Sequence, residues 1–219
     1  MDISQYLIKW GLISIIWTGW CVLHSTLNSE GIIHRIGLLD STIGPYYRLI
    51  YSVVALLTLL LAHWITPKWQ EFDLWRFRGA VRIFQLILWL LAILMFYLSF
   101  RFINLWHFLG LTALGVGRKG TDTQNRLITS GIYGLIRNPQ FAAGLILLWA
   151  RNLTDTGMVI NVVLSLYLMV GTKTEEARLL AGFGEEYRQY MLEVPRFFPN
   201  RKPSLQALFQ GSINPKPKA

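Results

Sequence analysis

The chain has 219 residues, of which 53% are hydrophobic and only 15% are charged. An ordinary soluble domain has about 25% charged residues, so this composition excludes a disordered protein, a coiled coil and most soluble enzymes. The mean hydropathy of +0.39 and the net charge of +9 are typical of a membrane protein with Lys and Arg on its cytoplasmic side, and they require no nucleic-acid partner. Cys21 is the single cysteine, which excludes an internal disulfide and a CxxC metal site.

Three apolar stretches are long enough for a membrane-spanning helix, which needs about 20 residues. They run from Leu7 to Leu27, from Tyr46 to Ile65 and from Val81 to Phe100. The first is not typical of a cleaved signal peptide, because its apolar run is too long and no small-residue cleavage site follows it. We therefore predict three spanning helices in this half of the chain.

Two shorter apolar stretches follow, at 141–150 and 158–170, and the polar sequence RNLTDTG separates them. A single long kinked helix is the alternative to a hairpin. It would place Arg151 and Asp155 in the middle of the membrane, which is energetically expensive. We predict a C-terminal helical hairpin, and in total an all-α polytopic membrane helical bundle of about five transmembrane helices.

The distribution of positive charge predicts the orientation of this bundle. With five helices and the N-terminus outside, most of the 21 Lys and Arg residues fall in the inner loops and the C-terminal tail. The loop at 67–80, which contains the sequence RFR, is the exception. We predict a multi-pass membrane protein with a cytoplasmic C-terminus. It consists of a single domain at 1–200 and a flexible basic tail at 201–219.

A helix start is predicted at Asn138, because Asn is a favoured N-cap and Pro139 suits the first helical position. A helix N-terminus has free N–H groups and can hold a carboxylate or phosphate. Arg137 adds a fork-shaped cationic donor beside it. This combination predicts an anion site at the cytoplasmic membrane boundary. The alternative is an arginine that reaches lipid headgroups beside an ordinary capped helix.

Adjacent carboxylates, Glu175 and Glu176, follow the second apolar arm. If the hairpin closes, this acidic pair faces the helix start at Asn138 and Pro139. A cation-binding carboxylate opposite an anion-binding helix end suits a zwitterion, such as an amino-acid moiety. A solvated acidic turn is the alternative.

The sequence GIYGLIRNPQFAAG, the hairpin and the sequence EEARLLAGFGEEYRQYMLEVPRFFP together resemble the membrane-embedded S-adenosylmethionine methyltransferases. That family includes isoprenylcysteine carboxyl methyltransferase, the phospholipid methyltransferases and the methanethiol S-methyltransferases. Its pattern is similar to G-x-Y-x-x-x-R-H-P-x-Y-x-G, followed by E-E and F-G-x-x-Y-x-x-Y. The matching residues are Gly131, Tyr133, Arg137, Pro139, Gly144, Glu175, Glu176, Phe183, Gly184, Tyr187 and Tyr190. Asn138 and Phe141 stand where the family has His and Tyr, so a His-based role does not carry over.

The resemblance implies an integral membrane methyltransferase with a cytoplasmic cofactor site. The residues implied to bind S-adenosylmethionine are Gly131, Tyr133, Asn138, Pro139, Glu175 and Glu176. The implied catalytic residues are Glu176, as a base for a thiol, and Arg137, as the partner of a carboxylate. The expected acceptor is a small thiol, a lipid or an isoprenylcysteine-like molecule, with the lipid bilayer as a second partner.

Two histidines support a different hypothesis. His24 lies near the end of the first spanning stretch, which is unusual. This half of the chain resembles a related membrane group that contains zeta-carotene isomerase, and some members of that group use haem. His24 and His107 would then be axial haem ligands of an isomerase or redox protein. The plain alternative is a His24 hydrogen bond within the bundle, with His107 at the interface. A non-catalytic membrane adaptor is a third hypothesis.

Overall fold

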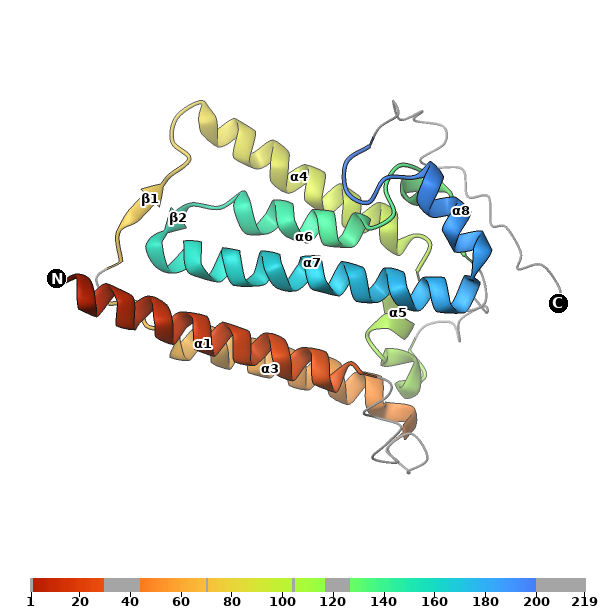
Figure 1. Ribbon diagram of the computed structural model, residues 1–219, viewed down its shortest axis with the longest axis horizontal. Coiled ribbons are helices and arrows are strands. Elements are labelled where there is room, and N and C mark those ends of the chain that lie inside the picture. The colour runs from red at the N-terminus through yellow and green to blue at the C-terminus, as the bar shows by residue number, and fades with distance from the viewer. Residues whose placement is uncertain (1, 30–43, 70, 104, 117–126, 200–219) are drawn as a thin grey trace. The chain divides into compact units, whose positions relative to one another are not determined.

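The computed structural model describes residues 2–29, 44–69, 71–103, 105–116 and 127–199 (Figure 1). Four segments of the described chain are long and apolar enough to cross a membrane. They are α1 (Ile3–Leu27), Gly44–Ile65 with α3 (Tyr47–Ile65), α4 (Val81–Phe100) and α7 (Asp155–Phe183). The predicted helical membrane bundle is confirmed. The predicted basic tail at 201–219 lies outside the described residues.

A fifth apolar helix, α6 (Pro139–Trp149), is much shorter than the others. Its 11 residues span about 16 Å at 1.5 Å per residue, roughly half of the 30 Å hydrocarbon layer. The predicted first arm of the hairpin is therefore present, but it does not cross the layer by itself.

The fold divides into two compact units that share α7. The first unit contains 1–76, 105–119 and 152–164, and the second contains 77–104, 120–151 and 165–219. The predicted single domain at 1–200 stays a prediction.

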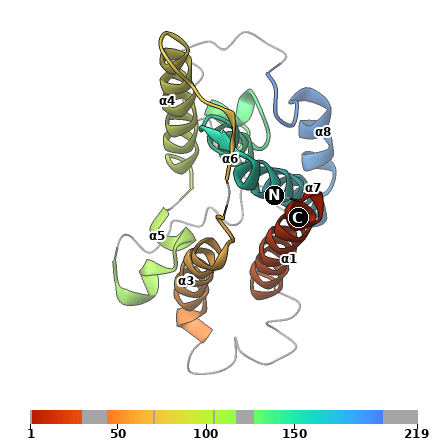
Figure 2. The ribbon, with the colours of Figure 1, turned by 90° about the vertical axis from the view of Figure 1, so that its left-hand side faces the viewer.

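In the first unit, α1 and α3 run side by side (Figures 1 and 2). An apolar core forms around Ile13 and Trp17 of α1 and Ile160 of α7. Only 6% of the apolar window of α3 is buried. An apolar helix with so much exposed surface is suited to contact with lipid. A small antiparallel sheet of β1 (Asp73–Trp75) and β2 (Leu153–Thr154) also belongs to this unit.

A buried ion pair joins α1 to the start of α7. The Lys9 ammonium lies 2.8 Å from Oδ2 of Asp155, and both side chains are buried. The Trp10 indole N–H donates to the same oxygen at 3.0 Å, and the Phe72 backbone N–H donates to Oδ1 at 3.3 Å. Asp155 is the first residue of α7, and both of its carboxylate oxygens accept hydrogen bonds. This pairing was not predicted from the sequence.

Two glycines with left-handed backbone flank a short 3-10 helix, η2 (Leu111–Leu114), after α5 (Leu105–Phe108). Gly110 has φ +77° and Gly115 has φ +76°. A Cβ on Gly110 would collide with the backbone of Arg48 and Leu49, whereas Gly115 faces open space.

Gly110→Ala is therefore expected to destabilise the protein more than Gly115→Ala. The second change carries only the left-handed penalty of about 1–2 kcal/mol, while the first adds a backbone clash. Thermal unfolding in detergent measures both variants. Equal falls in the unfolding midpoint would contradict this prediction.

In the second unit, α6 lies between α4 and α7 (Figure 1). The Gln85 amide and the Trp89 indole of α4 donate to the carbonyl of Ala150 at 3.0 and 2.7 Å, where α6 ends. Along α7, Gly171 faces Phe141 and Ser165 accepts a hydrogen bond from Trp149. Residue numbers rise along α6 as they fall along α7, so the two helices form the predicted antiparallel hairpin.

Helix α7 extends well beyond the predicted arm at 158–170. Its 29 residues span about 43 Å, which exceeds the thickness of the hydrocarbon layer. Glu175 and Glu176 thus lie inside the helix, not after it. The polar sequence TKTEEARLLAGF is rich in good helix formers and has no proline, so the helix continues after the apolar pattern ends. It stops before Gly184, whose φ of +56° turns the chain into α8 (Glu185–Glu193).

Candidate functional site

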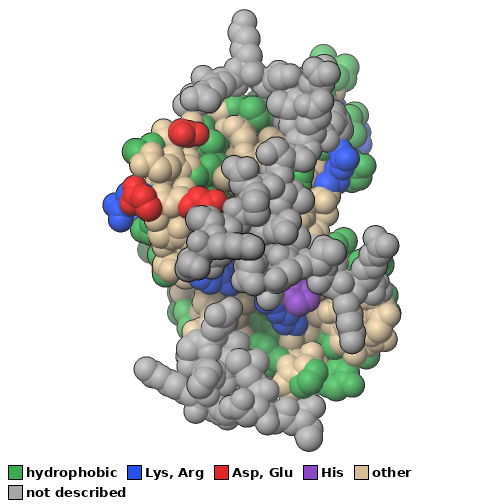
Figure 3. Space-filling model, turned by 90° about the vertical axis from the view of Figure 1, so that its right-hand side faces the viewer, with side chains coloured by type: hydrophobic (Ala, Val, Ile, Leu, Met, Phe, Trp, Pro, Cys, Tyr) green, Lys and Arg blue, Asp and Glu red, His purple; other side chains and the backbone are tan. Residues whose placement is uncertain are grey.

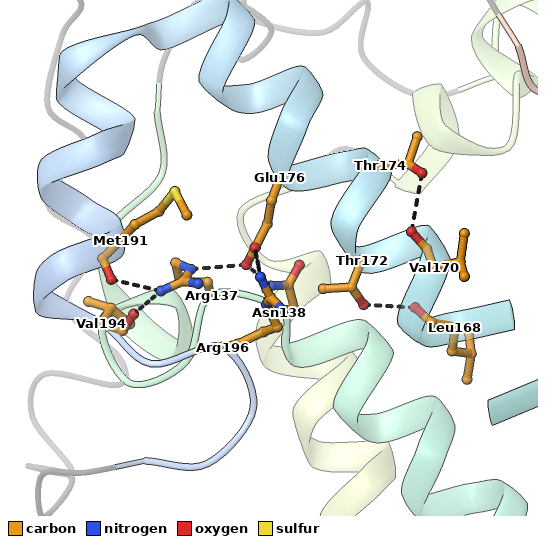
Figure 4. A network of polar contacts seen from close by, with 10 residues as sticks. All are labelled: Arg137, Asn138, Leu168, Val170, Thr172, Thr174, Glu176, Met191, Val194 and Arg196. Atoms are coloured by element: carbon orange, nitrogen blue, oxygen red, sulfur yellow. Dashed lines mark hydrogen bonds and ion pairs between the residues drawn. The ribbon is translucent and has the colours of Figure 1, made fainter. Parts of the chain in front are cut away.

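The Glu176 carboxylate is the centre of a buried polar network (Figure 4). Its Oε1 accepts hydrogen bonds from Arg137 Nε at 3.0 Å and Asn138 Nδ2 at 2.8 Å. Its Oε2 accepts from Arg196 Nε at 3.0 Å and Nη2 at 2.5 Å. We call these four residues the Glu176 cluster. It joins α7, the start of α6 and the segment after α8.

Arg137 fixes the end of α8 to the rest of the cluster. Its Nη1 donates to the carbonyl oxygens of Met191, at 2.9 Å, and Val194. Its backbone N–H donates to the carbonyl of Pro195 at 2.9 Å. The side chain is only 8% exposed. Arg137 thus stabilises the C-terminal end of α8, as a cation at this position does.

The predicted helix start is confirmed, but Asn138 uses its side chain differently. Pro139 is the first residue of α6, and Asn138 precedes it without a side-chain cap hydrogen bond. The Asn138 amide donates instead to Glu176. Both Asn138 and Pro139 are buried. The anion beside this helix start is therefore the carboxylate of the chain's own Glu176.

The prediction that both glutamates face the start of α6 is wrong for Glu175. Its carboxylate pairs with Arg178 at 2.7 Å, and 34% of its side chain is exposed. Successive residues of an α-helix point about 100° apart, so one helix cannot aim both side chains at Asn138. Figure 3 shows acidic and basic side chains that adjoin on the surface of the molecule.

Gly131 and Tyr133 belong to a short 3-10 helix, η4 (Gly131–Gly134), that precedes the cluster. Gly131 is buried and has φ +64°, a conformation that glycine adopts easily. The Tyr133 hydroxyl accepts a hydrogen bond from the Gln140 amide at 2.6 Å. Burial raises the pKa of Tyr133 to about 12, so this hydroxyl is neutral at physiological pH.

Two tyrosines of the family pattern form a core under the cluster. Tyr187 and Tyr190 are buried together with Leu127 and Val194. The Tyr190 hydroxyl donates to the carbonyl of Tyr133 at 2.6 Å. Burial, followed by the charge of Glu176, raises the pKa of Tyr187 to about 12. These residues hold α8 against η4.

The raised tyrosine pKa values predict instability in alkali. Unfolded tyrosine ionises near pH 10, whereas Tyr187 in the folded protein ionises near pH 12. This stabilisation is complete below about pH 10 and is lost between about pH 10 and 12. We expect the thermal midpoint to fall over that interval, and to fall less steeply in Tyr187→Phe. An unchanged pH slope in that variant would contradict the prediction.

The known proteins that are similar to this chain are methanethiol S-methyltransferases by name. The chain is 26% identical over 170 residues to methanethiol S-methyltransferase of Pseudomonas deceptionensis, covering 74% of this chain and 64% of the relative. It is 29% identical over 166 residues to methanethiol S-methyltransferase 1 of Bradyrhizobium diazoefficiens, covering 72% and 56%. These similarities agree with the resemblance of its motifs to the membrane methyltransferases. These matches span only 56% and 64% of the relatives' own length. No protein-family model and no solved structure matches the chain.

These methyltransferase relatives do not support the haem hypothesis. In the structure, Nε2 of His24 lies 2.7 Å from the hydroxyl of Tyr51, as the plain alternative expects. His107 belongs to α5 of the same unit.

Arg196 is the member of the cluster that sequence reasoning missed. Its contact with Glu176 spans 20 residues and depends on the turn at Gly184 and the end of α8. The local sequence VPRFFP contains Arg196 among apolar residues and prolines, and this setting could have indicated a partly buried arginine. The predicted catalytic roles of Arg137 and Glu176 stay predictions.

Proposed function

We propose that the protein is an integral membrane methyltransferase that uses S-adenosylmethionine, and that its acceptor is a small thiol. The observation that carries this proposal is the Glu176 cluster. It brings the two family motifs together at the hairpin, through Arg137 and Asn138 on one side and Glu176 on the other. The methanethiol S-methyltransferase relatives favour a thiol over the lipid and isoprenylcysteine-like acceptors.

The residues fit the proposed cofactor in two different ways. Tyr133, Asn138 and Glu176 are buried, so they would shape the wall of the site. Glu175 has a partly exposed carboxylate and is suited to the ammonium group of an amino-acid moiety. The cofactor, when bound, supplies a methyl group activated by its sulfonium. Site preorganisation and exclusion of water are then the main contributions of the chain.

The contacts of Glu176 favour a positioning role over the role of a base. Two guanidinium groups and one amide donate to its oxygens. Accepting a proton would weaken these charge-assisted hydrogen bonds. Arg137 is similarly committed to Glu176 and to the end of α8. We infer that both residues hold the site in shape while the thiol proton leaves to solvent.

Calorimetry of the purified protein with S-adenosylhomocysteine tests the cofactor. We expect saturable binding with one site per chain, and its absence from the folded protein would refute the proposal. Transfer of a labelled methyl group then distinguishes the acceptors, with methanethiol, phospholipid vesicles and farnesylcysteine in parallel. Exclusive labelling of a lipid or of farnesylcysteine would contradict the thiol. Binding without transfer to any of the three would favour the adaptor hypothesis.

A further inference from the structure

The Glu176 cluster has more positive than negative charge. It contains the guanidinium groups of Arg137 and Arg196, one carboxylate, and the neutral amide of Asn138. The carboxylate of Glu176 can balance only one of the two cations. A buried cation is costly unless an anion balances it, and Glu176 balances the buried Arg137. The cluster is therefore one negative charge short of neutrality.

The two arginines differ in how their donors are used. Arg137 is 8% exposed and donates both to Glu176 and to backbone carbonyls of the α8 end. Arg196 is 37% exposed, and its Nε and Nη2 both donate to one oxygen of Glu176. Within the described part of the chain, no hydrogen-bond partner is found for Nη1 of Arg196. Arg196 thus holds the surplus charge and is accessible.

The backbone holds Arg196 in place before any ligand binds. The Arg196 carbonyl accepts a hydrogen bond from the Asn138 N–H at 3.2 Å, and the neighbouring Pro195 carbonyl accepts from the Arg137 N–H at 2.9 Å. Glu176 fixes the guanidinium plane (Figure 4). An arginine fixed in this way loses little freedom when it binds a carboxylate.

We propose that Arg196 binds the carboxylate of the cofactor's amino-acid moiety through the edge that contains Nη1. This inference rests on the proposed function. The guanidinium of Arg196 then has Glu176 on one edge and the ligand carboxylate on the other, which makes the cluster neutral. Arg137 balances Glu176 and has no contact with the ligand carboxylate.

Binding of two ligands tests the assignment. One is S-adenosylhomocysteine, and the other is its decarboxylated analogue, which keeps the amine. We expect wild type to bind S-adenosylhomocysteine about 10-fold to 100-fold more tightly, as a charge-assisted contact predicts. Arg196→Gln should lose most of this preference by weakening the binding of S-adenosylhomocysteine alone. Arg196→Lys should keep part of it. Arg188→Gln is the matched control, because Arg188 forms an exposed ion pair with Glu185 of α8, and it should match wild type.

Each other outcome overturns the assignment. If Arg196→Gln weakens the binding of both ligands equally, Arg196 only positions Glu176. If that variant still prefers S-adenosylhomocysteine to the decarboxylated analogue as wild type does, Arg196 does not bind the ligand carboxylate and is available to another anion, such as a lipid phosphate. A wild type that binds both ligands equally overturns it even if the variants fail to fold. Absence of S-adenosylhomocysteine binding by folded wild type overturns the proposed function as well, which separates the two failures.

Discussion

Replacing Glu176 by glutamine is expected to destabilise the protein by about 3–5 kcal/mol, the typical effect of removing one partner of a buried ion pair. The Glu176 side chain is only 5% exposed, and its two oxygens accept four hydrogen bonds. A glutamine has one acceptor oxygen, and its amide nitrogen would point a donor at Arg137 or Arg196. Two partly buried guanidinium groups would then share no counter-charge. Binding of S-adenosylhomocysteine should be lost with the shape of the site.

The adjacent residue provides a matched control for this change. Glu175→Gln removes the same charge one position earlier in the same helix. Glu175 pairs at the surface with Arg178, whose side chain is 59% exposed, and such pairs contribute about 0–1 kcal/mol. Thermal unfolding of both variants in one detergent compares them directly. Equal destabilisation would contradict the central place of Glu176.

The bounds of the membrane helices could be predicted where the membrane dictates them. The apolar stretches at Tyr46–Ile65 and Val81–Phe100 agree with α3 and α4 almost to the residue. A spanning helix has no water to satisfy its backbone, so apolar residues and helix coincide there. Outside the hydrocarbon layer water can satisfy the backbone, so a helix and an apolar stretch need not have the same bounds. Helix α7 therefore continues beyond the apolar pattern, and its true end at Phe183 was not predicted.

Parts of the site that depend on local sequence were also predictable. The start of α6 at Pro139 follows from two adjacent residues. The approach of Glu176 to Asn138 follows from closure of the hairpin. The orientation of Glu175 depends on the rotational phase of α7, and the position of Arg196 depends on a turn and a further helix. Apolar periodicity does not determine either of these.

The pair of Lys9 and Asp155 is the clearest limit of sequence reasoning, because 146 residues separate them. Asp155→Ala is expected to destabilise the protein by about 3–5 kcal/mol, since it leaves a fully buried ammonium without its anion. Trp10 and Phe72 would lose their acceptor at the same time. A large fall in the thermal midpoint in detergent is the expected result.

A double variant tests whether the unpaired ammonium and the lost acceptor cause this instability. Lys9→Met with Asp155→Asn removes both charges, keeps an acceptor for Trp10 and fills a similar volume. It should recover most of the stability lost in Asp155→Ala, because no buried charge is left unpaired. A double variant as unstable as the single one would contradict this explanation, because it has no unpaired charge and still has an acceptor for Trp10. Both residues lie outside the Glu176 cluster, so the folded fraction of either variant should bind S-adenosylhomocysteine with unchanged affinity. This pair therefore stabilises the first unit, whereas Glu176 is expected to affect stability and binding together.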